Sequence, residues 1–179
     1  MNKPSYIIRT PRLGLRPWYD ADRAPFARLN QDPDVMRYFP SMPADAETSA
    51  AIDRQIHHQS RHGFCFWATD LLEEERFVGF IGLCTTRFSA SFTPAVEIGW
   101  RVAKDYWGQG LAPEGAAACL EFARERLHLT EVYSFTPLSN RPSERVMQKI
   151  GMEHVGSFMH PLIAEGHPLQ EHLLYYIRL

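Results

Sequence analysis

The stretch from Val96 to Gly115 reads Val-Glu-Ile-Gly-Trp-Arg-Val-Ala-Lys-Asp-Tyr-Trp-Gly-Gln-Gly-Leu-Ala-Pro-Glu-Gly, and it decides the fold of this chain. The segment from Ala95 to Val102, which overlaps its beginning, alternates apolar and polar residues and predicts a β-strand. Gly108 and Gly110 then lead into a segment of small residues that predicts a helix starting at Leu111. The first N–H groups of a helix have no partners within it, and the helix dipole favours negative charge there. The junction therefore predicts an anion site, most naturally for a phosphate or pyrophosphate.

Two common phosphate loops do not fit this junction. A Walker-type loop needs Lys and Ser or Thr after its last glycine, where this chain has Leu111 and Ala112. A dinucleotide fingerprint needs a third small residue where Pro113 stands. The stretch from Trp107 to Ala112 instead resembles the Gln/Arg-x-x-Gly-x-Gly/Ala pyrophosphate loop of the GNAT superfamily of acetyl-CoA-dependent N-acetyltransferases. Trp107 departs from that pattern, and a Tyr-Trp-Gly-Gln-Gly loop is typical of a branch similar to the ribosomal-protein N-terminal acetyltransferases of RimJ/RimL type.

Three further segments resemble the same branch and occur in the expected order. They are Arg9 to Pro17, similar to its opening strand, Asp32 to Pro40, similar to the segment after its first helix, and Asn140 to Met152, similar to an Asn-x-x-Ser helix. The resemblance covers roughly residues 6 to 178. It implies a single N-acetyltransferase domain over residues 1–179, of α/β (α+β) class. The implied sheet is mixed, largely antiparallel and seven-stranded, with flanking helices.

Composition bounds the class of protein. A chain of 179 residues is long enough for one domain with a substantial core. The formal net charge of -2 gives no broad basic surface, so we expect no nucleic-acid partner. We find neither a long apolar run nor a signal-peptide pattern, and we expect no membrane association. Cys65, Cys84 and Cys119 are few and widely spaced, which indicates reduced thiols in a cytoplasmic protein.

Hydrophobic periodicity and turn residues predict the remaining elements. The expected strands are Tyr6 to Arg16 (interrupted by Pro11), Phe64 to Asp70, Phe77 to Thr85, Ala95 to Val102, Glu131 to Thr136, Glu153 to His160 and Gln170 to Arg178. The expected helices are Asp20 to Asn30, Asp45 to His62, Leu111 to Leu127 and Arg141 to Ile150.

The resemblance implies acetyl-CoA as co-substrate, bound mainly through backbone groups of the strand end, the glycine loop and a later helix start. The implied cofactor-binding residues are Trp100, Arg101, Val102, Trp107, Gly108, Gln109, Gly110, Leu111, Ala112, Asn140 and Ser143. A backbone N–H near the strand end would polarise the thioester carbonyl.

Acetyl transfer also needs a base for the amine and a proton for the departing thiolate. Glu97 is our candidate base, since it shares one side of its strand with Gly99 and Arg101, and Gly99 leaves room for an acceptor amine. The alternative is a structural carboxylate paired with an arginine.

Asn140 is a candidate N-cap for the helix that starts at Arg141, and the resemblance adds contact with the CoA arm. Many GNAT enzymes have a Tyr acid at the position of Met147, which cannot donate a proton. The resemblance places Ser143 in that role, by hydrogen bonding to the thiolate or by relay from water. The alternative for Ser143 is a residue of the first helical turn without catalytic part.

Aromatic residues near loops are candidates for the acceptor groove. We assign Tyr38, Phe39, Phe88 and Phe92 to substrate binding, with the loop from Phe88 to Pro94 as the main specificity segment. We expect no metal, because the His58 and His62 pair lacks an intervening Glu and a third ligand.

The acceptor itself remains open at this stage. It is a primary amine, with a protein N-terminal α-amine as the first candidate and a small amine, such as an antibiotic or polyamine, as the alternative. A CoA-binding regulatory module without catalysis is the third reading, kept open by Met147. We expect a monomer or a homodimer.

Overall fold

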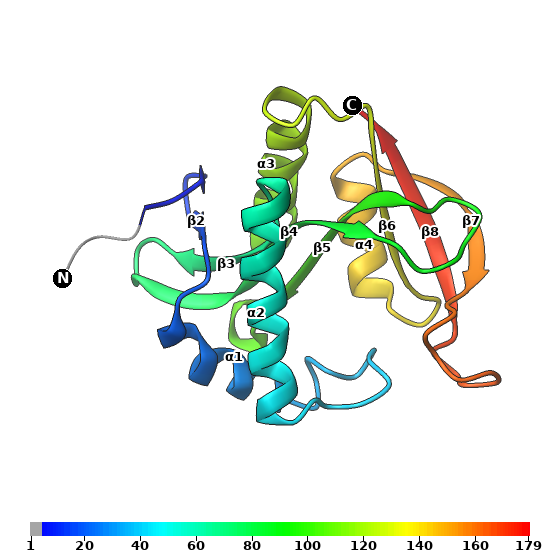
Figure 1. Ribbon diagram of the computed structural model, residues 1–179, viewed down its shortest axis with the longest axis horizontal. Coiled ribbons are helices and arrows are strands. Elements are labelled where there is room, and N and C mark those ends of the chain that lie inside the picture. The colour runs from blue at the N-terminus through cyan, green and yellow to red at the C-terminus, as the bar shows by residue number, and fades with distance from the viewer. Residues whose placement is uncertain (1–4) are drawn as a thin grey trace.

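The computed structural model describes residues 5–179, and residues 1–4 of the predicted domain lie outside that range. Eight strands form one sheet in the order β1-β2-β3-β4-β5-β6-β8-β7 (Figure 1). All neighbouring strands are antiparallel except β5 and β6, which are parallel. The strands are β1 (Ile8–Arg9), β2 (Leu13–Arg16), β3 (Phe66–Leu71), β4 (Arg76–Thr86), β5 (Ala95–Val102), β6 (Glu131–Pro137), β7 (Glu153–Met159) and β8 (Glu171–Arg178). The helices are α1 (Arg23–Asn30), α2 (Asp45–His62), α3 (Leu111–Glu125) and α4 (Arg141–Lys149).

The predicted sheet of seven strands is wrong by one, and the difference lies at the start of the chain. The segment predicted as one interrupted strand folds into two, with β1 pairing antiparallel to β2. The backbone N–H of Thr10 donates to the carbonyl of Leu13 at 2.9 Å, and the Leu13 N–H donates to the Thr10 hydroxyl at 2.8 Å. Pro11 lies in this turn, where its missing N–H is no loss.

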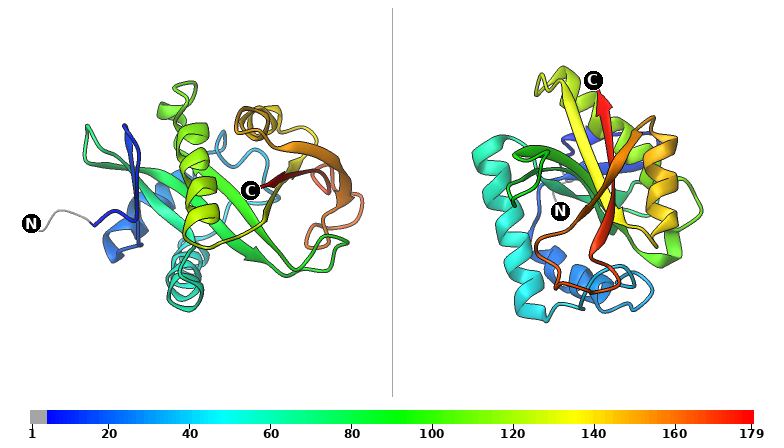
Figure 2. Two further views of the ribbon diagram at one scale, coloured as in Figure 1. Left: turned by 90° about the horizontal axis from the view of Figure 1, so that it is seen from above. Right: turned by 90° about the vertical axis from the view of Figure 1, so that its right-hand side faces the viewer.

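The helices cover both faces of the sheet. Figure 2 shows α1 and α2 on one face and α3 and α4 on the other. Helix α2 ends, as predicted, at Gly63, whose φ of 81° favours glycine. Helix α3 lies close to the sheet because Gly115 has no side chain: a Cβ there would lie 2.5 Å from Cδ1 of Ile81. The sheet and α3 enclose a core that includes the fully buried Trp67.

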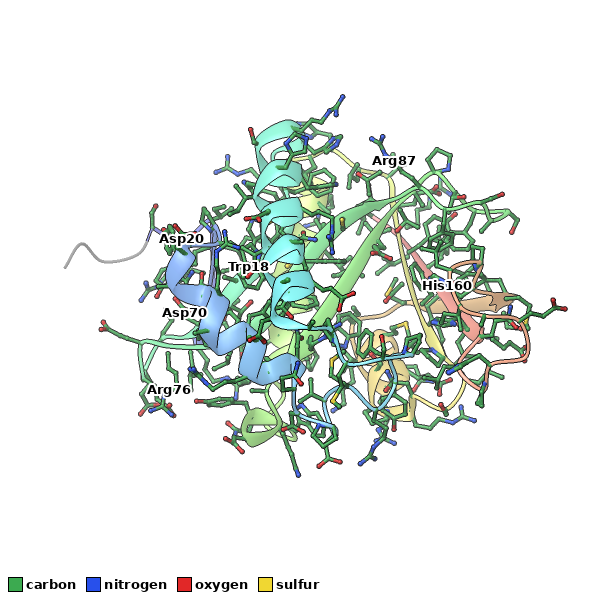
Figure 3. The ribbon with its side chains drawn as sticks, turned by 60° about the horizontal axis from the view of Figure 1, so that its bottom comes forward. Trp18, Asp20, Asp70, Arg76, Arg87 and His160 are labelled. Carbon is green, nitrogen blue, oxygen red and sulfur yellow. The ribbon has the colours of Figure 1, made fainter. Side chains whose placement is uncertain are left out.

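A buried charge network fixes α1 to the N-terminal half of the sheet. Arg16 on β2 donates through Nε and Nη2 to Asp70, at 2.7 and 2.8 Å, and through Nη1 and Nη2 to Asp22, at 2.7 and 2.9 Å. Figure 3 shows Asp70 with Trp18 and α1, and His160 at the other end of the molecule among the C-terminal strands. Each of the three Arg16 guanidinium nitrogens donates to Asp22 or Asp70, and the role of Arg16 is therefore structural.

Candidate active site

Strands β5 and β6 diverge at the centre of the sheet and open a cavity of about 820 Å³. In this parallel pair of strands Glu97 lies opposite Tyr133, and the Ser134 hydroxyl donates to the Ile98 carbonyl at 3.0 Å. Every residue from Glu97 to Val102 lines the cavity, as does every residue from Ser134 to Pro137. Because successive strand residues point to opposite faces, a cavity lined by all of them passes between the two strands.

The glycine loop forms one end of this cavity. Gly108 and Gly110 have φ values of 75° and 77°, which favour glycine, and Gly110 is the N-cap of α3. The Trp107 indole N–H donates to the Val102 carbonyl at 2.7 Å and anchors the loop to β5. Free N–H groups at the start of α3 therefore border the cavity, in the arrangement that suits an anion.

Gln109 differs from its neighbours in the loop. Gly108, Gly110, Leu111 and Ala112 line the cavity together with Trp107. The Gln109 side chain instead donates to the Asp105 carbonyl at 3.2 Å, and its own carbonyl accepts from Arg12 Nη1 at 2.8 Å. Gln109 thus stabilises the loop conformation through these two hydrogen bonds and does not line the cavity.

Glu97 lies at the point where β5 and β6 separate. Burial raises its pKa to about 7, and interaction with the Thr86 side chain acts in the opposite direction. It forms no ion pair with any residue in the described part of the chain, so the arginine partner considered from the sequence is absent from that part. A carboxyl group with this pKa can exchange a proton near neutral pH.

The space beside Gly99 is not open as the sequence suggested. An ideal Cβ on Gly99 would lie 3.1 Å from Cε1 of Phe66. The missing side chain therefore makes room for the Phe66 ring, which itself lines the cavity. Gly99 thus allows the Phe66 ring to form an aromatic wall of the cavity.

Trp100 and Ser143 meet across the opening between β5 and β6. The Trp100 indole N–H donates to Ser143 Oγ at 3.0 Å. Asn140 is the N-cap of α4, as predicted: its Oδ1 accepts from the Ser143 N–H at 3.3 Å, and its Nδ2 donates to Thr136 Oγ1 at 2.8 Å. Met147 is fully buried and forms part of the core. The Ser143 hydroxyl is thus held at the cavity, while the Met147 position faces away from it.

The predicted acceptor residues divide into two groups. Tyr38 and Phe39 line the cavity. Phe88 and Phe92 are not among the lining residues, and they pack against each other and against Phe158. The Phe88 ring centroid lies 4.6 Å from that of His160, which does line the cavity.

Several residues that line the cavity were not predicted from the sequence. They are Phe66, Phe80, Phe135, His160, His172, Arg145 and Lys149. The period-two pattern of β3, β4 and β6 was the available signal for the aromatic ones, but it does not tell a core face from a cavity wall. For Arg101, only backbone contacts were predicted, whereas its guanidinium group packs on the ring of Phe39, which lines the cavity.

Among residues 5–179, no group of three or more His, Cys, Asp or Glu side chains has an arrangement that could hold a metal ion. No helix in the same range is both long and apolar enough to cross a membrane.

Comparison with known proteins places this geometry in a family. Residues 12–153 match the model of the acetyltransferase (GNAT) domain. The chain is 34% identical over 180 residues to the FsC-acetyl coenzyme A-N(2)-transacetylase of Aspergillus fumigatus, an alignment that covers 92% of this chain and 74% of that protein. The chain therefore belongs to the GNAT acetyltransferase domain family, and it is an N-acetyltransferase.

Solved structures agree with the fold. A GNAT-family acetyltransferase from Bacillus anthracis is 26% identical, with a TM-score of 0.78 over 96% of this chain and 97% of that one. A spermidine N-acetyltransferase from Vibrio cholerae, in complex with CoA and spermine, is 17% identical, with a TM-score of 0.73 over 94% of this chain and 96% of that one. At that identity the second structure shares the fold alone.

Proposed function

We propose that this protein transfers the acetyl group of acetyl-CoA directly to a primary amine in a ternary complex, and that residues 1–179 act as one catalytic domain. The observation that carries the proposal is the meeting of two features in one cavity: the glycine loop before α3 and the Glu97 carboxyl group with its pKa of about 7. A free anion site supports binding of the CoA pyrophosphate, and the carboxyl group supports proton transfer.

The loop from Gly108 to Ala112 fits a pyrophosphate. A Cβ added to Gly108 would meet no atom within 4 Å, so a ligand can approach the backbone. The N–H groups at the start of α3 donate to the phosphate oxygens, and the helix dipole adds favourable potential. The cavity between β5 and β6 then takes the pantetheine arm, along the backbone of Trp100 to Val102.

Glu97 accepts the proton that the amine loses. A peptide α-amine has a pKa of about 7.7–8.0, so a base with a pKa near neutrality is well matched to it. Transfer is direct, or passes through one water molecule. A backbone N–H of β5 stabilises the oxyanion that forms on the thioester carbonyl.

Ser143 stabilises the departing thiolate. Its Oγ already accepts a hydrogen bond from Trp100, so its hydroxyl hydrogen is free to donate to sulfur. A serine hydroxyl is a weak acid, and the final proton therefore comes from water through this hydrogen bond.

Two classes of primary amine are candidates for the acceptor. The RimJ/RimL-type motif at Tyr106 to Gly110 and the serine at position 143 support a peptide N-terminal α-amine. A small amine is the second candidate, supported by the spermine-bound structure of similar fold. The three cysteines are free, which fits the proposed cytoplasmic location.

Calorimetry with CoA and a thiol-release assay test the proposal together. We expect CoA to bind in the micromolar range, about -8 kcal/mol, and acetyl-CoA to release thiol only when a suitable amine is present. The amine panel should contain peptides, polyamines and aminoglycosides. Absence of binding at millimolar CoA contradicts the proposal, and binding without thiol release across the panel favours a CoA-binding regulatory module.

A further inference from the structure

Arg101 projects from β5 toward α1, on the face opposite to Trp100. Its guanidinium carbon lies 4.0 Å from the ring centroid of Phe39 and 5.4 Å from that of Phe80. Its Nη1 donates to Asn30 Oδ1 at 2.6 Å. Two aromatic rings and one amide thus hold the guanidinium in a fixed position at the wall of the cavity.

No carboxylate pairs with this guanidinium in the described part of the chain. Its Nε is buried and has no hydrogen-bond partner there. Burial lowers the pKa of Arg101 to about 10, with no acidic neighbour to oppose the effect. A buried cation without a counter-ion is unfavourable, so its presence calls for a partner that arrives with a ligand.

Arg16 shows how this chain treats a buried arginine with a structural role. Arg16 holds Asp70 through Nε and Nη2, the edge that binds a carboxylate side-on, and it also holds Asp22. The corresponding edge of Arg101 has no acceptor in residues 5–179. The difference between the two arginines is that Arg101 lines the cavity.

The cavity itself supplies no free carboxylate near Arg101. Its acidic lining residues are Asp34 and Glu97. Asp34 is already paired with Arg37 and Lys104, each at 2.5 Å. Glu97 lies on the same face of β5 but four residues away, about 13 Å along the strand at 3.3 Å per residue.

Aromatic surface separates Glu97 from Arg101. Phe66 fills the space above Gly99, and its ring stacks on Phe80 with centroids 5.2 Å apart. A molecule that reaches from Glu97 to Arg101 therefore crosses an apolar wall between a base and a cation.

We propose that the acceptor is an amine that also carries a carboxylate, about 10 Å from its nitrogen across an apolar spacer, and that Arg101 binds this carboxylate. The inference rests on the proposed function and specifies its substrate class. The CoA phosphates are a less suitable partner, because the Arg101 side chain lies on the sheet face opposite to α3. A polyamine is disfavoured, since its second ammonium group would meet the Arg101 cation.

Three probes that differ only in the group at the far end test the proposal. They are ω-aminooctanoate, ω-aminooctanamide and octane diamine, which present a carboxylate, a neutral amide and an ammonium group. In wild type we expect kcat/KM to fall in that order, with the carboxylate at least about tenfold better than the amide. In Arg101→Gln the ratio of carboxylate to amide should fall to about one, and Arg101→Lys should retain part of the preference.

A second pair of probes asks whether a peptide supplies the same chemistry. Ala-Ala-Glu-amide and Ala-Ala-Gln-amide differ in one charge at a similar distance from the α-amine. A preference for the acidic peptide that exceeds the preference for ω-aminooctanoate identifies a peptide acceptor. The reverse identifies a small amino acid, and either result requires loss of the preference in Arg101→Gln.

Two controls separate binding from structure. Arg145→Gln removes another cation of the same cavity and should keep the carboxylate preference. Arg101→Gln should still gain thermal stability from CoA, and its unfolding temperature without ligand should change by no more than a few degrees, because it removes an unpaired buried charge.

Equal rates for the carboxylate and amide probes in wild type, or an unchanged preference in Arg101→Gln, overturn the inference. So does failure to acetylate any probe of either series. Turnover of other amines in the panel then shows that the proposed function survives without it.

Discussion

The indole Nε1 of Trp100 donates to Oγ of Ser143 at 3.0 Å and joins β5 to the first turn of α4. This bond uses one lone pair of the hydroxyl oxygen and leaves its hydrogen free to face the cavity. Under the proposed function, Trp100 is therefore a positioning residue for the hydroxyl group that we propose donates to the thiolate.

A double-mutant cycle tests this pairing. Ser143→Ala should lower kcat by roughly tenfold, and Trp100→Phe, which keeps the aromatic ring but removes the donor, should have a similar effect. The KM for acetyl-CoA should change little in either. Because both act through one hydroxyl group, the double mutant should be no slower than Ser143→Ala alone. Fully additive effects would show that the two residues act independently.

Glu97→Gln should lower turnover by roughly 100-fold or more at neutral pH and leave CoA affinity nearly unchanged. In wild type, kcat/KM should rise with pH up to about 7, as the Glu97 carboxyl group with its raised pKa loses its proton. The variant should lack this limb of the profile. A variant with the wild-type rate and profile would mean that the amine loses its proton elsewhere.

The same carboxyl group makes folding stability depend on pH in a predictable direction. Its folded-state pKa of about 7 lies above the ordinary value of 4.5. Between these values the folded protein binds a proton that the unfolded chain has released, so stability falls as pH rises through this window. Glu97→Gln does not titrate, and its unfolding temperature relative to wild type should therefore increase from acidic pH to pH 8. A constant difference across this range would show that Glu97 is not desolvated.

Removal of the structural arginine should have a different result from removal of Arg101. Arg16→Gln leaves Asp22 and Asp70 buried without their cation and should lower the free energy of unfolding by about 3–5 kcal/mol. Arg23→Gln, which removes a partly exposed cation paired with Asp20 and Asp53, is the matched control and should change stability little. Chemical denaturation measures both, and equal stabilities of the two variants would contradict the account of the network.

Much of the fold follows from local signals in the sequence. The bounds of α2 and β5 match the predictions because an αL glycine ends the helix at Gly63 and regular alternation marks the strand from Ala95 to Val102. The extra strand was missed because Tyr6 to Arg16 was predicted as one strand interrupted by Pro11, whereas the Thr10 side chain closes a turn there. The local sequence pattern identifies the interruption at Pro11, but it does not predict that β1 and β2 pair with each other.

The features of the site also divide into those that local sequence predicts and those that depend on contacts between distant residues. The glycine loop and the Asn140 cap are local features and were visible in the sequence. The Trp100–Ser143 bond joins residues 43 positions apart across the opening of the sheet, and no periodicity predicts it. The role of Gly99 was misjudged because the ring that fills its space comes from β3, and the open edge of Arg101 appears only once its surroundings are assembled.

The measurement that tests the central claim most directly is thermal unfolding with and without CoA in wild type, Gly110→Asp and Gly166→Asp. Gly110 and Gly166 share a φ of 77°, so both variants bear similar backbone strain, but only Gly110 lies at the start of α3. A carboxylate at position 110 should exclude and repel the pyrophosphate. We expect wild type and Gly166→Asp to gain stability from CoA by linkage and Gly110→Asp to gain none. A full CoA-induced gain in Gly110→Asp would contradict the account, because the cofactor phosphates would then lie elsewhere.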